Sequence, residues 1–130
     1  MLNYNRFYKE LGNLFYCIAS ADGKIKPDEK KRLNEEIQYN WKHFDHSTDR
    51  FGSDRAFVIQ YEFDTMEDAF ETPGHAYESF ELYFKDNEKH IDKHTRQKIF
   101  NSARHIAESF RKINVPELNY VMRLKKLLDV

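Results

Sequence analysis

The stretch Leu14-Phe-Tyr-Cys-Ile-Ala-Ser-Ala-Asp-Gly-Lys-Ile-Lys-Pro-Asp-Glu29 joins the end of one helix to the start of the next. Apolar residues at the spacing i, i+3, i+4 and i+7 precede it and run into it, which indicates a helix with one buried face. Gly23 supplies the left-handed conformation that ends a helix. Pro27 then opens another helix, with Asp28 and Glu29 in its first turn. The stretch therefore predicts a helix-loop-helix unit.

A similar unit recurs later in the chain. When the sequence is slid along itself, residues 18–29 align with residues 106–117, and five of the twelve aligned positions are identical. We interpret this as a duplicated helical hairpin whose two copies pack together. The simpler alternative is that any two such units share an apolar period and a proline start. The identical pairs are Ile18 and Ile106, Ala19 and Ala107, Lys24 and Lys112, Ile25 and Ile113, and Glu29 and Glu117.

The two predicted loops differ in their polar residues. The first contains Asp22 and Gly23, whereas the second has Phe110 and Arg111 at the aligned positions. We therefore expect any activity to lie on the first loop, with Glu117 as the contribution of the second copy.

The remaining chain also favours helices. Residues 56–63 have the composition of a strand, but a helix would place Ala56, Ile59, Gln60, Phe63, Met66 and Phe70 on one face, so we predict one or two short helices. The segment from Asp64 to Glu67 has the spacing of a capping box. On the last helix we expect four inward-facing residues: Leu118, Val121, Met122 and Leu128. The predicted fold is all-α, a single multihelical domain over residues 1–130.

Composition excludes several classes of protein. The chain has 21 basic and 22 acidic residues, a net charge of -1, and lacks the basic excess of nucleic-acid binders. No apolar stretch approaches the length of a membrane span or a signal peptide. The one cysteine, Cys17, fits a reducing compartment. We expect a cytoplasmic protein that contacts neither nucleic acid nor membrane.

The Asp-Gly loop overlays the second half of a calcium-binding EF-hand loop. Asp22 falls on its fifth position, Gly23 on its sixth and Glu29 on its twelfth, but its first ligand would be Ile18. The sequence thus allows only a weak divalent-cation site, formed by Asp22, Glu29 and Glu117, and no other cofactor is expected. The alternative is that Asp22 accepts hydrogen bonds from loop amides while Glu29 and Glu117 cap helices.

The quoted stretch resembles the signature of the TerB-like family, in which an alanine-rich helix ends in Ala-Asp-Gly. An aliphatic residue then follows two places on, and a glutamate four places after that. The family includes tellurite-resistance TerB proteins and the N-terminal domain of DjlA-type co-chaperones. The matching residues are Ala19, Ala21, Asp22, Gly23, Ile25 and Glu29.

The resemblance implies a multihelical bundle built by duplication of a helical hairpin, with Glu117 in the degenerate second copy. It also implies a non-enzymatic module in stress response. Such a module would bind a partner protein, or a divalent cation, through a small set of residues near the first loop. These candidate binding residues are Asp22, Gly23, Asp28, Glu29 and Glu117.

Three other hypotheses come from the residues. Two His-x-Asp segments, at 43–46 and 90–94, have spacings that could ligate a metal, although solvated histidines fit these polar stretches better. A carboxylate-based enzyme is a weaker alternative, since no nucleophile elbow or phosphate loop occurs. The aromatic residues, 11 Phe, 8 Tyr and 1 Trp, allow a patch that forms a homodimer. The candidate patch contains Tyr39, Trp41, Phe44, Phe51, Phe57, Tyr61 and Phe63.

Overall fold

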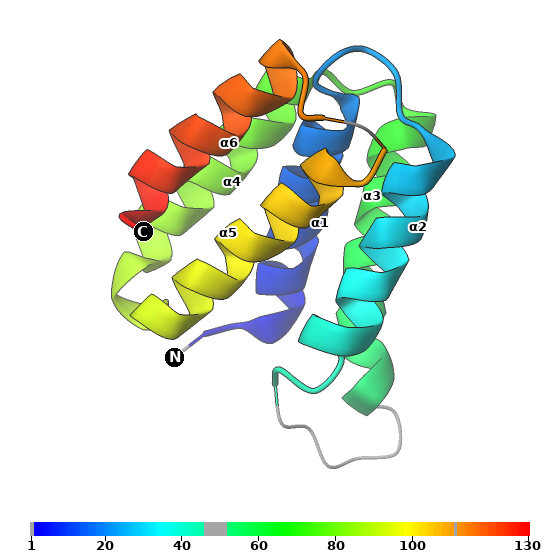
Figure 1. The fold of residues 1–130 in the computed structure, drawn as a ribbon. Coiled ribbons are helices and arrows are strands. Elements are labelled where there is room, and N and C mark those ends of the chain that lie inside the picture. Colours follow the sequence, from blue (N-terminus) through cyan, green and yellow to red (C-terminus); the bar gives the residue numbers. More distant parts are fainter. Residues whose placement is uncertain (1, 46–51, 111) are drawn as a thin grey trace.

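The computed structural model describes residues 2–45, 52–110 and 112–130. In these residues the chain forms six α-helices and no strand, which confirms the all-α prediction (Figure 1). Three short helical segments join or extend them: η1 (Ile37–Trp41), η2 (Gly52–Phe57) and η3 (Glu88–His90). The α-helices are α1 (Tyr4–Ser20), α2 (Pro27–Glu36), α3 (Val58–Asp68), α4 (Pro73–Asn87), α5 (Lys93–Glu108) and α6 (Val115–Leu128).

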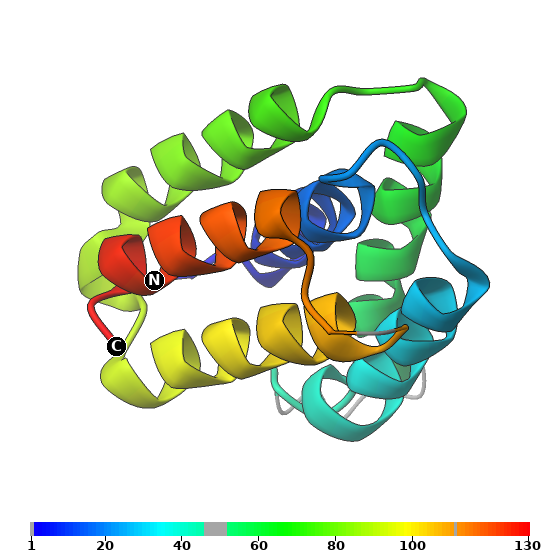
Figure 2. The same ribbon diagram turned by 45° about the horizontal axis from the view of Figure 1, so that its top comes forward.

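Helix α1 lies at the centre of the bundle and packs against α3, α4, α5 and α6 (Figure 2). Almost all of its residues from Phe7 onward are buried, and they belong to one hydrophobic cluster that draws on every α-helix. Gly12 allows the closest approach, because a Cβ atom there would lie only 2.7 Å from the carbonyl oxygen of Ile59 on α3. Cys17 is buried in the same cluster as a free thiol.

Helix α2 and η1 are held against α5 by a buried polar chain. The Trp41 indole donates to the Ser102 hydroxyl (3.0 Å), and that hydroxyl donates to the Glu36 carboxylate (2.8 Å). Leu33, Ile37 and Trp41, spaced four residues apart on one face, are fully buried.

The middle of the chain is helical, as predicted, but two details were wrong. Asp64 and Glu67 form no capping box, because both lie inside α3 rather than at its start. Phe70 does not share the buried face of Ile59 and Phe63: α3 ends at Asp68, and Phe70 lies in the following loop with 90% of its surface exposed.

The last helix corrects a further expectation. Val121 and Leu128 are buried, as predicted, but Leu118 and Met122 are exposed. Helix α6 packs with the face that carries Leu124, Leu128 and Val121, in that order around the helical wheel, and Leu118 and Met122 lie beyond Val121 on the outward side.

The candidate aromatic patch is mostly internal. Trp41 and Phe63 are buried, and Phe44 and Phe57 pack against the hydrophobic cluster, whereas Tyr39 and Tyr61 are exposed; Phe51 lies outside the described residues. This surface therefore offers little support for a homodimer. In the described part of the chain, no helix is both long and apolar enough to cross a membrane.

The helices alternate in direction, which gathers three connections at one end of the bundle, at the top of Figure 1. These connections are residues 21–26, 69–72 and 109–114, of which residue 111 is not described. We call this end of the molecule the loop end.

Candidate functional site

Two glutamates hold the starts of α2 and α6 in the same way. The Glu29 carboxylate accepts the backbone N–H of Lys26 (2.8 Å), and the Glu117 carboxylate accepts that of Asn114 (3.1 Å). The Asn114 side chain in turn accepts the N–H of Glu117 (2.9 Å), which completes a capping box. Glu29 and Glu117 are aligned positions of the proposed repeat and play the same part here, although the duplication itself stays a prediction.

The Glu117 carboxyl lies close enough to that of Glu29 to raise its pKa. Glu29 and Glu117 are only 1% and 3% exposed. Both carboxylates are acceptors when ionised, and the second oxygen of Glu29, Oε2, has no donor among the described residues. Burial, followed by the neighbouring Glu117 carboxyl, raises the pKa of Glu29 to about 8. At neutral pH the pair therefore holds a proton, which lets one carboxyl donate to the other.

Asp22 is not bonded to this glutamate pair; three hydrogen-bond donors hold its carboxylate. Its carboxylate accepts the backbone N–H of Lys24 (3.1 Å), the Asn114 side-chain amide (3.0 Å) and the Lys26 ammonium. Burial alone would raise the pKa of Asp22, but the hydrogen bonds from Lys26 and Lys24 lower it. Gly23 follows with φ at 88°, the left-handed conformation predicted for it.

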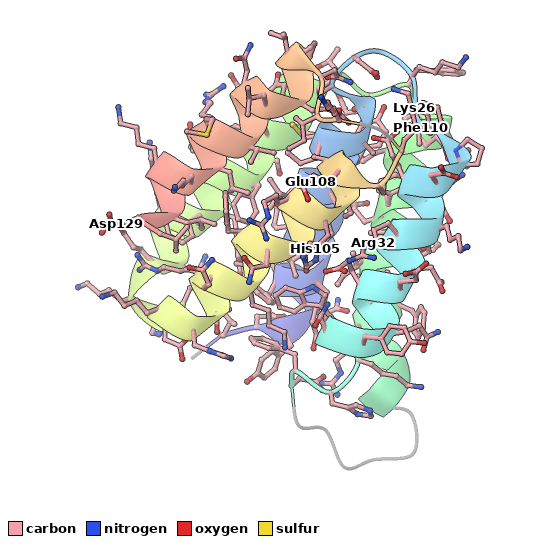
Figure 3. The ribbon with its side chains drawn as sticks, viewed as in Figure 1. Lys26, Arg32, His105, Glu108, Phe110 and Asp129 are labelled. Carbon is pink, nitrogen blue, oxygen red and sulfur yellow. The ribbon has the colours of Figure 1, made fainter. Side chains whose placement is uncertain are left out.

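Lys26 connects the two parts of the site. Its ammonium bonds Asp22 and lies 5.8 Å from the centre of the Phe110 ring, and Figure 3 shows the two side chains together at the loop end. Burial alone would lower the pKa of Lys26, but the bond to Asp22 and the charges of Asp22, Glu29 and Glu117 raise it. A pocket of about 220 Å³ opens here, lined by Asp22, Lys26, Ala107, Phe110, Lys112, Asn114 and Glu117.

The predicted site is therefore only partly assembled. The structure brings Glu29 and Glu117 together and links Asp22 to Glu117 through Asn114, but Asp28 is exposed and joins none of them. Across residues 2–45, 52–110 and 112–130, no three acidic, histidine or cysteine side chains are grouped as a metal site requires. The ion pair and hydrogen bonds described above join the two hairpins, and we call the residues that make them the clasp: Asp22, Lys26, Glu29, Asn114 and Glu117.

Sequence reasoning missed the two residues that complete this clasp, Lys26 and Asn114. Asn114 was identifiable, because Asn-x-x-Glu with a proline between is a helix-start signal. Lys26 carried no such signal, since a lysine in a polar loop is ordinarily solvated.

It also missed Phe70, which lies at the loop end after α3. Phe70 has φ at 53°, a left-handed conformation that bulky residues rarely adopt. The N–H groups of Phe70 and Glu71 bond the carbonyls of Glu67 and Met66 (both 3.1 Å), which is the Schellman closure of a helix that normally uses glycine. The Tyr16 hydroxyl donates to the Glu71 carbonyl (2.6 Å), so the loop is anchored while the Phe70 ring faces solvent.

Comparison of the chain with protein-family models, with curated proteins and with solved structures finds no match in any of the three. Its function is therefore inferred from the residues described above.

Proposed function

We propose that this chain is a TerB-like, non-enzymatic module that binds a partner protein through the loop end. The observation that carries the proposal is Phe70, a ring that is 90% exposed and held in a left-handed backbone conformation. That conformation is unfavourable by about 1–2 kcal/mol for a residue other than glycine. The exposed ring recovers none of this by burial within the chain, so binding to another molecule is the use that explains it.

The charges around Phe70 indicate what the partner presents. Glu67 and Asp68 occupy the last turn of α3, where negative charge opposes the helix dipole, and Glu71 follows in the loop. Lys30 pairs with Glu67 (2.6 Å), and His75 lies 3.0 Å from Glu71. An exposed ring whose neighbouring carboxylates are mostly paired fits an apolar pocket with a polar rim on the partner protein.

The TerB-like assignment is supported by the Ala-Asp-Gly motif and by two hairpins, α1–α2 and α5–α6, that start their second helices with equivalent glutamates. The role in stress response follows from that resemblance alone. Growth of the host lacking this chain, with and without tellurite, tests the stress role separately from the binding proposal.

The binding proposal is tested by capture on the immobilised chain. Wild-type protein and the variants Phe70→Ala and Leu82→Ala are exposed to lysate of the host; Leu82 is an exposed apolar residue on α4 and serves as the matched control. We expect a protein retained by the wild type and Leu82→Ala but lost, at least tenfold, with Phe70→Ala. Equal capture by all three forms would contradict the proposal.

A divalent cation at the clasp is a second candidate, favoured by the buried Glu29 oxygen that has no donor among the described residues. A cation there would displace Lys26 and use Glu29, Glu117 and Asp22 as oxygen ligands. Titration of Ca²⁺ or Mg²⁺ followed by the amide signals of residues 22–29 tests it, and unchanged signals at millimolar ion would remove it. An enzyme has less support, because Glu29 is almost inaccessible to a substrate.

A further inference from the structure

A second pocket lies away from the loop end, between η1 and the first turns of α5. Its volume is about 350 Å³, enough for a small organic molecule. It brings together described parts of the two histidine-containing segments, 43–46 and 90–94, for which the sequence favoured solvated histidines; His46 lies outside the described residues. The pocket is lined by Tyr39, Asn40, His43, Phe44, Asp92, His94, Thr95 and Lys98.

Lys98 is the unusual residue of this pocket. Its ammonium lies 5.1 Å from the centre of the Trp41 ring and 5.4 Å from that of Phe44, so two aromatic faces cover one side of the charge. No carboxylate of the described residues pairs with it, and partial burial is what lowers its pKa. A cation drawn out of water without an anion is unfavourable, and cation–π contacts offset only part of this.

The other polar groups leave the pocket open to an anion. Asp92 is the one acidic residue in the lining, but its carboxylate is already bound by the Thr95 N–H (2.8 Å) and the Thr95 hydroxyl. His43 and His94 both line the pocket, one from each segment, and both are exposed.

We propose that this pocket binds the phosphate group of a small phosphorylated organic molecule, with Lys98 as its principal cation. A phosphate monoester carries nearly two negative charges at neutral pH and offers several acceptor oxygens, which suits a site with one lysine and two histidine side chains as donors. A carboxylate carries a single negative charge, which Lys98 alone would neutralise. The rings of Tyr39 and Phe44 provide apolar surface for the organic part of the ligand.

Trp41 is the single tryptophan of the chain and lies beneath the Lys98 ammonium of this site, so its fluorescence reports on binding. The probes are phenyl phosphate, inorganic phosphate and benzoate, each titrated at constant ionic strength. We expect saturable changes with both phosphates, tighter for phenyl phosphate, and binding of benzoate at least tenfold weaker. Benzoate binding as tightly as phenyl phosphate would overturn the assignment to phosphate, and no saturation with any probe would overturn the site.

The variants compare Lys98→Met with Lys93→Met, which removes an equal charge from the exposed first turn of the same helix. We expect Lys98→Met to weaken phenyl phosphate at least tenfold and Lys93→Met less than twofold. Equal weakening would show that surface charge alone attracts the ligand and would contradict the proposal. Since Lys98→Met also changes the environment of Trp41, phosphorus-NMR line broadening of phenyl phosphate gives a second readout, and circular dichroism confirms that both variants fold.

Discussion

The carboxyl groups of Glu29 and Glu117 face each other in the interior of the loop end, although each is also the capping residue of its own helix. Two like charges at this depth would repel strongly, and burial penalises each of them further. A proton held by the pair removes the repulsion and supplies the hydrogen bond that Glu29 Oε2 otherwise lacks. The contact between the two hairpins is therefore sensitive to pH.

This pair predicts a stability that falls as the pH rises. The pKa of Glu29 is raised from 4.5 to about 8 in the folded chain, so between these values the folded state holds a proton that the unfolded state has released. The free energy of unfolding then decreases with rising pH, by at most about 1.4 kcal/mol per unit. The contribution is complete below pH 4.5 and lost above pH 8.

The test is Glu29→Gln, whose amide oxygen still accepts the Lys26 N–H. Its NH₂ group donates to Glu117 without the uptake of a proton from solvent. We expect its stability relative to the wild type to grow from pH 5 to pH 8, measured by urea denaturation. Asp28→Asn is the control, because Asp28 is the exposed neighbour on the same turn. A constant difference between Glu29→Gln and the wild type would show that the pair holds no proton.

Gly12 is predicted to resist substitution despite its helical position. Alanine in the middle of a helix normally stabilises by about 1 kcal/mol relative to glycine. At Gly12, however, the new Cβ would lie 2.7 Å from the Ile59 carbonyl oxygen and 2.8 Å from the Glu62 Cβ, so α1 and α3 must separate. We expect Gly12→Ala to destabilise by about 1–3 kcal/mol in thermal or urea unfolding.

Gly74 provides the comparison for that variant. It lies in the first turn of α4, and its nearest neighbour to an added Cβ is the Tyr120 hydroxyl at an ordinary 3.6 Å. Gly74→Ala should therefore be neutral or stabilising, and an equal loss in both variants would refute close helix packing as the cause.

Phe70→Gly is predicted to stabilise the chain while removing its binding. Glycine adopts the left-handed conformation without strain, and the exposed ring contributes little to the core. Glycine also has more conformational entropy to lose on folding, which offsets part of this effect. We therefore expect a net gain of about 0.5–1 kcal/mol in the free energy of unfolding. Phe70→Ala keeps the strain and should show no gain; a destabilised Phe70→Gly would mean that the ring packs on its own chain.

Ser102→Ala is predicted to loosen α2 and η1 from α5. It leaves the buried Trp41 N–H without an acceptor and takes one donor from Glu36, which costs about 1–3 kcal/mol. Denaturation followed by Trp41 fluorescence measures this loss. Ser109→Ala removes a hydroxyl that bonds only the nearby Ile106 carbonyl, so a similar loss there would argue against the Trp41 chain as the cause.

Much of the fold was predictable because its signals are local. Gly23 and Pro27 mark the loop between α1 and α2, and the stripe of Leu33, Ile37 and Trp41 is buried as its spacing indicates. Phe70 shows the limit of prediction from apolar spacing. Its spacing fits the face of Ile59 and Phe63, but the helix closes two residues earlier through hydrogen bonds that periodicity does not report.

The candidate sites, like the fold, combine features that local sequence determines with features that only the packing of helices determines. The sequence by itself determined the all-α class and the helix start at Pro27, and it offered capping by Glu29 and Glu117 as one of two alternatives, because caps and apolar periods act within a few residues. Only the tertiary structure decided that Glu29 meets Glu117, that the Asn114 amide donates to Asp22, and that Lys98 lies beside Trp41. These contacts join residues far apart in the chain, and the packing of α1, α2 and α5 determines which of them meet.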